Sequence, residues 1–407
     1  MSAGADVEAD LAAFRRGAVD LIEAGELAER GARARAERRP LRVKFGMDPS
    51  SPDLHLGHAI PLFLLRSLQD LGHQVVLIVG DATARLGDPS GRNKLRPQLS
   101  REEVEANLAT YTEQAARVID MERAEVRRNS EWFDRMGFDD VLRLMGRMTL
   151  ARMIERDTFA RRIERGEPVG LHELLYPLMQ GWDSVMVRCD VEIGGTDQLF
   201  NLLVGRELQR AEGQPGQVCL TLPLINGLDG RKMSKSYGNA IGLTESAAEM
   251  FGKVMSLPDE ALADWLRLLT PLSDEERARL LAGHPREAKA RLAEEIAARF
   301  HGREAARAAR EGFDRQFRDR ELPESIPELY YPGEWPARGV PLAVVLREVA
   351  LAASSSDARR LVEQGGVRVD GEVVRDPMLP LHPERAGHLL QIGRRRVARV
   401  FPAASES

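Results

Sequence analysis

Between residues 41 and 80, a strand-like segment, a turn-rich loop, a helix-like segment and a second strand-like segment follow one another. Residues 41–46 favour a short strand and residues 48–52 read Asp-Pro-Ser-Ser-Pro. Residues 56–71 have apolar side chains at helical spacing, and residues 74–80 favour a buried strand. This order is typical of the opening of a parallel α/β sheet, in which ligands bind at the carboxyl ends of the strands. We therefore expect a ligand site just after the first strand.

The rest of the chain favours helices. Residues before Pro40 read as helices rich in Ala, Glu and Arg. In the sheet domain we expect a strand at 189–193 and helices at 100–119, 171–187 and 196–211. Residues 132–168 have helical spacing and predict an insertion between the two halves of the sheet. The pattern is helical again from 242 to 317, and the prolines between 323 and 336 indicate a linker.

Composition excludes several classes of protein. The 407 residues allow two or three domains, and 43% apolar with 30% charged residues is typical of a soluble globular protein. Cys189 and Cys219 are too few for a disulfide framework or a four-cysteine zinc site. The N-terminal segment has no signal-peptide core and no apolar run is long enough to span a membrane. We expect a cytoplasmic protein without a membrane partner.

Charge is unevenly distributed along the chain. The formal net charge is −5, yet residues 336–407 contain 11 arginines against eight acidic residues, and Arg394, Arg395 and Arg396 are adjacent. A weakly basic C-terminal module attached to an otherwise acidic chain is consistent with an RNA partner. On charge alone, a solvated charged strand end explains the cluster equally well.

Lysine is rare in this sequence, and its distribution is informative. Six of the 58 basic residues are lysine, and two of these six, Lys232 and Lys235, lie in the segment Lys-Met-Ser-Lys-Ser at 232–236. A compact ammonium can follow a phosphate oxygen as charge moves, whereas a planar guanidinium cannot. A second segment, His-Leu-Gly-His at 55–58, opens a predicted helix whose N-terminus offers free N–H groups to an anion. Together the two segments indicate ATP chemistry.

Six stretches carry a family resemblance. The His-x-Gly-His and Lys-Met-Ser-Lys-Ser pair resembles the class I aminoacyl-tRNA synthetases. Residues 86–92, 176–183 and 193–198 resemble the bacterial tyrosyl-tRNA synthetases, and residues 356–371 are similar to the RNA-binding module with which those enzymes end. The resemblance implies a Rossmann-like parallel-sheet catalytic domain at 1–236 with a helical insertion at about 131–167. An α-helical anticodon-side domain and linker at 237–335 and a small α+β RNA-binding module at 336–407 would follow.

The spacing of Tyr176, Gln180 and Asp183 places them on one face of a helix. Taken alone, Gln180 and Asp183 could simply face solvent. The resemblance implies that Tyr176 and Gln180, with Asp88, hold the α-ammonium group of tyrosine. It further implies that Asp183 accepts the tyrosine hydroxyl and that Gln198 contacts the carboxylate.

The resemblance also implies an ATP site, with Mg²⁺ entering as part of the MgATP substrate and no protein-bound metal. Tyrosine would be activated to tyrosyl-adenylate with release of pyrophosphate, and then transferred to the 3′ end of tRNA(Tyr). His55, His58, Arg92, Arg96, Lys232 and Lys235 would act on the phosphates. The remaining ATP contacts would come from loop and motif residues, namely Gly46, Asp48, Ser50, Gly57, Gly195, Asp197, Met233 and Ser234. Arg359, Arg360, Arg368 and the arginines at 394–396 would contact RNA.

One position departs from the family pattern. Many tyrosyl enzymes have a tyrosine two residues before the Gly-x-Asp-Pro turn, and this chain has Lys44 there. Lys44 could pair with Asp183 or touch the ligand, and we include it among the candidate tyrosine-site residues. It could equally be a surface lysine at the start of a strand.

Other functions and states remain open from sequence alone. The chain could activate another aromatic amino acid, or be an RNA-binding paralogue without catalysis. A small nucleotidylyltransferase also uses a His-x-Gly-His loop but needs neither the helical domain nor the basic tail. The insertion is a candidate homodimer face, with a monomer that packs it internally as the alternative.

Overall fold

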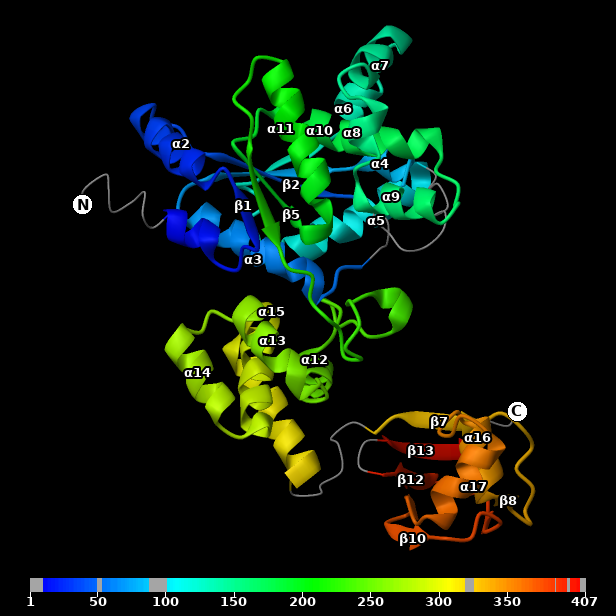
Figure 1. The fold of residues 1–407 in the computed structure, drawn as a ribbon. Coiled ribbons are helices and arrows are strands. Elements are labelled where there is room, and N and C mark those ends of the chain that lie inside the picture. Colours follow the sequence, from blue (N-terminus) through cyan, green and yellow to red (C-terminus); the bar gives the residue numbers. More distant parts are fainter. Residues whose placement is uncertain are drawn as a thin grey trace. The chain divides into compact units, whose positions relative to one another are not determined.

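The computed structural model describes residues 10–49, 53–87, 101–318, 326–384, 386–393 and 396–402. The chain forms two compact units, Met1–Ala309 and Arg310–Ser407 (Figure 1). None of the helices in the described residues is both long enough and apolar enough to cross a membrane.

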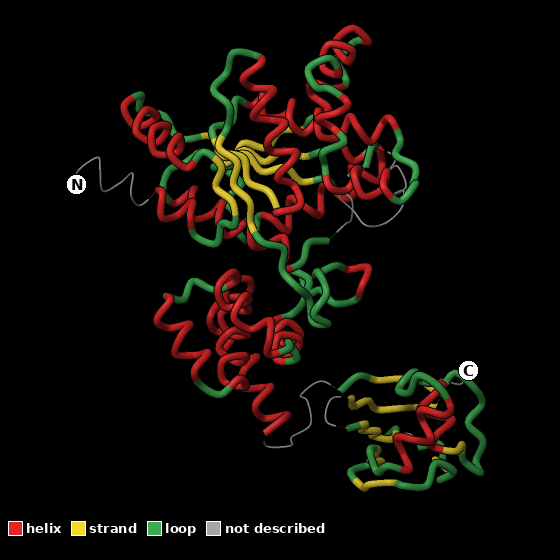
Figure 2. The backbone as a smooth tube through the Cα atoms, viewed as in Figure 1, coloured by secondary structure: helices red, strands yellow, loops and turns green. Residues whose placement is uncertain are grey.

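A six-stranded sheet forms the centre of the first unit, drawn in yellow in Figure 2. Its order is β1-β6-β5-β2-β3-β4, and the strands are β1 (Asp20–Ile22), β2 (Arg42–Met47), β3 (Gln74–Val79), β4 (Glu125–Arg128), β5 (Val191–Gly195) and β6 (Val218–Leu222). All neighbours are parallel except β1 with β6. The predicted α/β fold class is therefore confirmed. Because β2 and β5 are adjacent, the loops that follow them meet at one edge of the sheet.

Helices cover both faces of this sheet (Figure 1). On one face lie α3 (Leu56–Asp70) and α5 (Arg101–Ala115), and on the other lie α10 (Leu175–Val187) and α11 (Leu199–Ala211). Two further helices belong to this unit, α2 (Ala24–Ala36) and the single turn α4 (Asp81–Ala84). Burial from both faces explains why β3 and β6 are almost uniformly apolar, as parallel strands in doubly covered sheets usually are.

The predicted insertion is helical. It comprises α6 (Ser130–Phe133), α7 (Phe138–Met145), α8 (Leu150–Met153) and α9 (Asp157–Glu164), and a 3₁₀ turn, η1 (Leu171–Leu174), connects it to α10. Leu144, Met153 and Phe159 of the insertion are buried in a cluster with side chains of α10 and α11, such as Leu178 and Val204. One side of the insertion is therefore part of the core of the first unit.

The helical region begins after residue 242, as predicted. It contains α12 (Ala247–Met255), α13 (Leu262–Leu269), α14 (Asp274–Ala282) and α15 (Pro285–Arg318). Gly302 interrupts α15 with a φ of 83°. Trp265 of α13 is fully buried, and its Nε1 donates a 3.0 Å hydrogen bond to the carbonyl of Asn226. The helical region is thereby attached to the chain that leads into the Lys-Met-Ser-Lys-Ser segment.

The second unit contains a five-stranded sheet of order β10-β9-β12-β13-β7. The strands are β7 (Glu328–Tyr331), β9 (Val367–Val369), β10 (Glu372–Val374), β12 (His388–Ile392) and β13 (Arg396–Pro402). A two-stranded pair, β8 (Val340–Pro341) and β11 (Pro380–Leu381), and the helices α16 (Leu342–Glu348) and α17 (Ser355–Glu363) complete it. One buried apolar cluster holds the sheet and both helices together.

Several short strands differ from the sequence prediction. The region before Pro40 was expected to be helical, but Asp20–Ile22 pairs antiparallel with β6, about 200 residues away. The prediction also lacked β4 and β6. Residues 328–331, inside the expected linker, pair in parallel with β13 as β7. Pairing with distant partners defines these strands, and local periodicity does not reveal it.

Candidate active site

The His-Leu-Gly-His segment forms the first turn of α3. His55 is the N-cap, its Nδ1 accepts a 3.1 Å hydrogen bond from the Gly57 amide, and its own amide donates to His58 Nδ1 over 3.2 Å. The two rings lie 4.0 Å apart between centroids. A side chain at Gly57 would collide with the His55 ring, since an added Cβ would lie 2.9 Å from Cε1. Glycine is therefore required here by the histidine pair itself.

Both imidazoles are neutral at physiological pH. Burial, with the nearby His58 ring and the two lysines of the 232–236 segment, lowers the pKa of His55 to about 2. Burial and the charge of Lys235 lower the pKa of His58 to about 4. Because Nδ1 of each ring accepts a hydrogen bond, the proton of each neutral ring is on Nε2. The pair therefore offers two N–H donors, which suits phosphate oxygens.

The chain that follows the Lys-Met-Ser-Lys-Ser segment returns to the N-terminus of α3. The amide of Leu56 donates to the carbonyl of Ile241 over 2.9 Å, and His55 forms an isolated bridge with Gly242. Within the segment, Met233 is buried and its amide donates to the carbonyl of Ile225 over 2.9 Å. The chain just after the second motif is therefore joined by main-chain hydrogen bonds to the first motif, more than 170 residues away in sequence.

Asn239 fixes the turn around the motif. Its side-chain oxygen accepts from the Ser234 amide over 2.8 Å, and its Nδ2 donates to Asp229 Oδ1 over 2.6 Å. Gly227 has to be glycine, because a Cβ there would lie 2.4 Å from the Asn239 carbonyl oxygen.

The two lysines of the motif extend from this turn to two carboxylates. Lys232 Nζ donates a 3.2 Å hydrogen bond to Asp197 Oδ2, and Lys235 pairs with Asp53. Asp197 lies in the 3₁₀ turn η2 (Thr196–Gln198) at the end of β5, and Asp53 lies just before His55. Both ammonium groups are partly exposed and lie close enough to influence the histidine pair.

Asp48 is held at the carboxyl end of β2. Its Oδ2 accepts from the Tyr176 hydroxyl over 2.8 Å, and its Oδ1 accepts from Thr83 Oγ1 over 2.8 Å. Gly80 gives this carboxylate its room, since a Cβ at that position would lie 1.9 Å from Oδ1. Asp48, expected among the ATP contacts, is thus also linked to the predicted tyrosine-binding face of α10.

Asp183 is a buried carboxylate, 3% exposed, on the same helix. Trp132 Nε1 donates to its Oδ1 over 3.0 Å and Asn129 Nδ2 donates to its Oδ2 over 3.4 Å. Burial raises the pKa of Asp183 to about 7, against the opposing charge of Lys44 and the two hydrogen bonds. The alternative that Asp183 faces solvent is therefore wrong. Tyr176 is also buried and Gln180 partly so, and all three lie on α10 as predicted.

Lys44 is completely buried, so the alternative of a surface lysine is wrong as well. Its Nζ forms an ion pair with Glu192 Oε1 at 3.0 Å, and donates to the Gln180 carbonyl and to Ser184 Oγ, each over 2.8 Å. Its salt-bridge partner is thus Glu192 and not Asp183. Burial opposes the charged form, but the Glu192 and Asp183 carboxylates outweigh it and raise the pKa of Lys44.

Three side-chain amides connect this ion pair to the end of β5. Gln180 Nε2 donates to Glu192 Oε1 over 3.2 Å. Asn201 Nδ2 donates to Gln180 Oε1 over 2.9 Å and to Gln198 Oε1 over 2.8 Å. Gln180 and Gln198, both predicted to bind the amino acid, are therefore linked through Asn201.

Several predicted residues lie outside this cluster or outside the described residues. Ser50, Asp88, Arg92, Arg96, Arg394 and Arg395 are in the latter group. Gly46 and Gly195 lie at the ends of β2 and β5. A Cβ on Gly195 would lie 2.6 Å from Asp197 Oδ1, so this glycine makes room for the neighbouring carboxylate.

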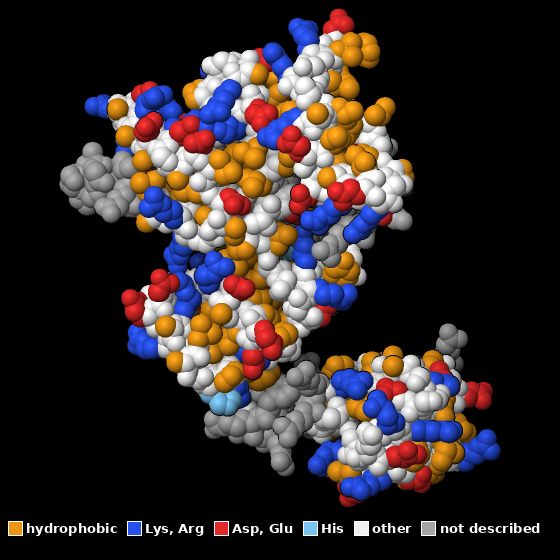
Figure 3. All heavy atoms as spheres, viewed as in Figure 1, with side chains coloured by type: hydrophobic (Ala, Val, Ile, Leu, Met, Phe, Trp, Pro, Cys, Tyr) orange, Lys and Arg blue, Asp and Glu red, His pale blue; other side chains and the backbone are white. Residues whose placement is uncertain are grey.

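The four candidate RNA-contacting arginines that the structure describes are exposed on the second unit, namely Arg359, Arg360, Arg368 and Arg396. Arg359 and Arg360 lie on α17, and Arg396 begins β13, where it donates to the Leu351 carbonyl over 2.8 Å. Arg368 pairs with Gln391 of β12, whereas Arg396 pairs with Ile392, so these two arginines lie on opposite faces of the sheet. Figure 3 shows basic side chains over much of the visible face of this unit, and they are all arginines because residues 326–407 contain no lysine.

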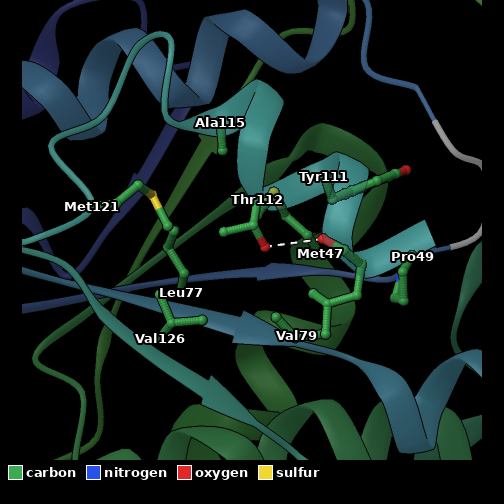
Figure 4. Close-up of a pocket in the computed structure, with 10 residues that line it drawn as sticks. Met47, Pro49, Leu77, Val79, Tyr111, Thr112, Ala115, Met121 and Val126 are labelled. Atoms are coloured by element: carbon green, nitrogen blue, oxygen red, sulfur yellow. Dashed lines mark hydrogen bonds between the residues drawn. The ribbon is translucent and has the colours of Figure 1, made fainter. Parts of the chain in front are cut away.

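An apolar pocket lies between α5 and strands β2 to β4 (Figure 4). Its lining includes Met47, Leu77, Tyr111, Met121 and Val126, without a charged side chain. It lies on the face of the sheet opposite α10, so it is not the predicted tyrosine pocket. Within the ranges that the structure describes, no cluster of three His, Cys, Asp or Glu side chains could hold a metal ion.

Comparison with known proteins identifies the family. The family model described as tRNA synthetases class I (W and Y) matches residues 36–318, and that of the S4 domain matches residues 340–385. The tyrosine–tRNA ligase of Bordetella pertussis is 49% identical over 403 residues, which cover 97% of each chain. The chain belongs to the class I tyrosyl-tRNA synthetase family. The resemblance seen in the motifs is thus confirmed.

Two further proteins support the assignment of the chain to the tyrosyl-tRNA synthetase family. The tyrosine–tRNA ligase of Thermotoga maritima is 47% identical over 394 residues, covering 95% of this chain and 96% of that one. A C-terminally truncated mitochondrial tyrosyl-tRNA synthetase of Aspergillus nidulans superposes with a TM-score of 0.62 at 26% identity. That superposition covers 75% of this chain and 94% of the other.

Sequence reasoning missed five residues that the structure places in the candidate site. They are Asn129 and Trp132 at Asp183, Glu192 and Ser184 at Lys44, and Asn201 between the two glutamines. A glutamate inside an apolar strand, Val-Glu-Ile at 191–193, is the one signal that could have indicated Glu192.

Proposed function

We propose that the chain is a tyrosine–tRNA ligase. It activates L-tyrosine with MgATP to tyrosyl-adenylate and pyrophosphate, and then transfers the tyrosyl group to the 3′ end of tRNA(Tyr). The observation that carries the proposal is the buried Asp183 carboxylate on the same face of α10 as Tyr176 and Gln180. This face lies next to the ends of β2 and β5, where the histidine and lysine motifs meet.

We assign the amino-acid pocket by chemistry. Asp183 accepts the tyrosine hydroxyl, and phenylalanine is rejected because the carboxylate would then be left buried without that partner. Since the Tyr176 hydroxyl donates to Asp48, its oxygen can accept from the substrate ammonium. Gln180 and Asp88 supply further acceptors for the ammonium, and Gln198 donates to the carboxylate.

In the first step, a carboxylate oxygen of tyrosine attacks the α-phosphorus of ATP. The bond from that phosphorus to the bridging oxygen of the β-phosphate breaks, and pyrophosphate leaves with the electron pair. The Nε2–H groups of His55 and His58, with Ser50, contact the triphosphate. Lys232, Lys235, Arg92 and Arg96 stabilise the charge that develops on the leaving pyrophosphate. Asp197 accepts hydrogen bonds from the ribose hydroxyls. Gly57 and Gly195 have no side chain and therefore leave space for the nucleotide.

In the second step, a hydroxyl of the terminal tRNA ribose attacks the tyrosyl carbonyl, and AMP leaves. Arg359, Arg360, Arg368 and Arg394–Arg396 contact RNA mainly through phosphates and shape, as a small basic module can. Because charged tRNA is consumed by translating ribosomes, we place the enzyme in the cytoplasm.

We also propose that the enzyme is a homodimer through the insertion. The side of the insertion away from the core exposes large apolar side chains, including Phe138 (76%) and Leu150 (64%), and the turn η1 that follows the insertion exposes Leu171 (82%). Such a patch is typical of a protein–protein interface. The internal packing of Leu144, Met153 and Phe159 does not compete with this, because it uses the other side of the insertion.

Pyrophosphate exchange into ATP tests the proposal. The assay is run without tRNA and separately with tyrosine, phenylalanine and tryptophan. Exchange with tyrosine alone is the expected result. Exchange with a different amino acid would assign another substrate, and no exchange from folded protein would favour the RNA-binding paralogue.

A further inference from the structure

The ammonium group of Lys44 has three N–H donors and no acceptor, and it contacts three acceptor groups. They are the Glu192 carboxylate, the Gln180 carbonyl and the Ser184 hydroxyl. Replacing a buried ion pair by apolar residues is often neutral or stabilising, so stability alone does not explain why this site keeps its charges. An ammonium in this place has one further consequence, which is that it approaches the Glu192 carboxylate as a donor and leaves that carboxylate in the role of acceptor.

Every hydrogen bond that the Glu192 carboxylate makes in the structure is one that it accepts. Its Oε1 accepts from Gln180 Nε2, and its Oε2 accepts from Ser184 Oγ over 3.1 Å and from Gln217 Nε2. A side-chain amide can in principle point either end toward a neighbour. Beside an acceptor-only carboxylate, Gln180 has to present its nitrogen, so its oxygen lies at the opposite end.

The orientation of Gln180 also determines which ends of the other two side-chain amides donate and which accept. Gln180 Oε1 accepts from Asn201 Nδ2, which also donates to Gln198 Oε1. The nitrogen of Gln198 is therefore its donating end. The buried Asn201 Oδ1 has no hydrogen-bond partner among the described residues, which is a costly state for a protein acceptor unless a ligand meets it.

We propose that the buried Lys44–Glu192 pair sets the direction of the amide chain Gln180–Asn201–Gln198, and thereby orients the amino-acid substrate without touching it. This inference rests on the proposed function, which assigns the ammonium to Gln180 and the carboxylate to Gln198. An amide oxygen at Gln180 attracts the ammonium, and an amide nitrogen at Gln198 attracts the carboxylate. Reversing the chain would place a donor against a cation and an acceptor against an anion. Lys44 and Glu192 are thus positioning residues.

The decisive variant is Glu192→Gln combined with Lys44→Met, which removes both charges together. The new side-chain amide at position 192 can present either end to Gln180, so the direction of the amides is no longer imposed. We expect the double variant to fold, with the KM for tyrosine in pyrophosphate exchange raised at least tenfold and the KM for ATP changed less than twofold. A wild-type KM for tyrosine in this folded variant would overturn the inference.

A charge relocation provides the rescue. In Gln180→Glu with Glu192→Gln, Lys44 is retained, and the acceptor-only group now faces the substrate ammonium directly. We expect this swap to recover most of the tyrosine affinity that Glu192→Gln alone loses. Because a carboxylate at residue 180 attracts the ammonium directly, a KM that stays unrescued in folded protein would contradict the assignment of the ammonium to this position and would overturn the inference.

Ligand analogues separate the two ends of the amino acid. Binding is measured with tyramine, which lacks the carboxylate, and with 3-(4-hydroxyphenyl)propionate, which lacks the ammonium. Glu192→Gln should weaken both ligands, tyramine through Gln180 and the propionate through Gln198, because the two amides belong to one chain. Weakened tyramine binding beside an unchanged Kd for the propionate would show that the direction does not pass beyond Gln180, and would overturn the inference.

The Arg206–Glu26 pair is the matched control. Arg206 is 4% exposed on α11, the helix that carries Asn201, and it pairs with Glu26 at 2.5 Å. Arg206→Met with Glu26→Gln should change the melting temperature but leave the KM for tyrosine within twofold of wild type. The proposed function is judged separately, because it fails only if the wild-type protein does not exchange with tyrosine.

Discussion

The ammonium of Lys232 donates to the Asp197 carboxylate over 3.2 Å, although Asp197 is the group that we assign to the ATP ribose. Ribose hydroxyls that donate to Asp197 would compete with Lys232 for this carboxylate, so nucleotide binding should release Lys232 toward the phosphates. The lysine motif is thereby coupled to occupancy of the ribose site.

This relationship gives the first prediction. Asp197→Ala should lower kcat/KM for ATP by about tenfold to a hundredfold, since a hydrogen bond to a charged group contributes about 1.5–3 kcal/mol. The KM for tyrosine should stay within about twofold. Asp264→Ala, which removes an exposed partner of Arg267, is the control and should change neither value. An unchanged kcat/KM for ATP in Asp197→Ala would exclude the ribose assignment.

The scarcity of lysine allows a second prediction. Lys235→Arg keeps the positive charge but replaces a compact ammonium by a planar fork, and it should lower kcat for exchange by about tenfold or more. Lys289 pairs with Asp259 in the helical region, and its arginine variant should keep the wild-type rate. If Lys235→Arg were as active as that control, the motif would need only positive charge.

Parts of this site are visible in the sequence because they are local. The i, i+4, i+7 spacing of Tyr176, Gln180 and Asp183 predicted both a helix and a shared face, and α10 has both. The strand–loop–helix–strand order predicted the sheet and the site at its edge. Lysine scarcity marked Lys44, Lys232 and Lys235 before any contact was known.

The remaining parts depend on contacts between distant residues. Trp132 reaches Asp183 across 51 positions, and Lys44 reaches Glu192 from a different strand. The three-residue strand β1 exists because β6 pairs with it, about 200 residues later. A local sequence pattern does not reveal which buried partner a polar residue contacts. Lys44 could therefore be recognised as unusual from the sequence, but its ion pair with Glu192 could not be predicted.

The buried Asp183 leads to a pH prediction. Its pKa is raised to about 7, so the carboxylate is ionised above that pH and protonated below it. Only the ionised form accepts a charge-assisted hydrogen bond from the tyrosine hydroxyl. The Kd for tyrosine, measured without ATP, should therefore rise as the pH falls from 8 to 5.5, with a midpoint near 7. His55 and His58 titrate below this window and do not contribute. Asp183→Asn should bind more weakly and without this dependence, whereas a flat wild-type profile would contradict the assignment.

Trp132 provides a milder perturbation of the same group. Trp132→Phe removes the indole N–H that donates to Asp183 Oδ1 and keeps most of the aromatic volume. The carboxylate loses a partner for its ionised form, so its pKa should rise and the midpoint of the tyrosine Kd profile should move above 7. Trp335→Phe, in the second unit, loses a comparable indole bond to the Leu381 carbonyl and should leave the profile unchanged. A Trp132→Phe profile that coincides with wild type would mean that this bond does not tune Asp183.

The exposed side of the insertion leads to the last prediction. Phe138→Asp with Leu150→Asp places charges on two of its most exposed apolar side chains, at 76% and 64%. In a dimer these positions would be desolvated, and two unpaired charges there would cost several kcal/mol. Light scattering should show a dimer for wild type and a monomer for the variant. The melting temperature of the monomer indicates whether the core-facing side, with Leu144 and Phe159, remains packed. Leu281→Asp on α14, also exposed at 45%, should leave the dimer intact, and a dimeric Phe138→Asp/Leu150→Asp variant would place the interface elsewhere.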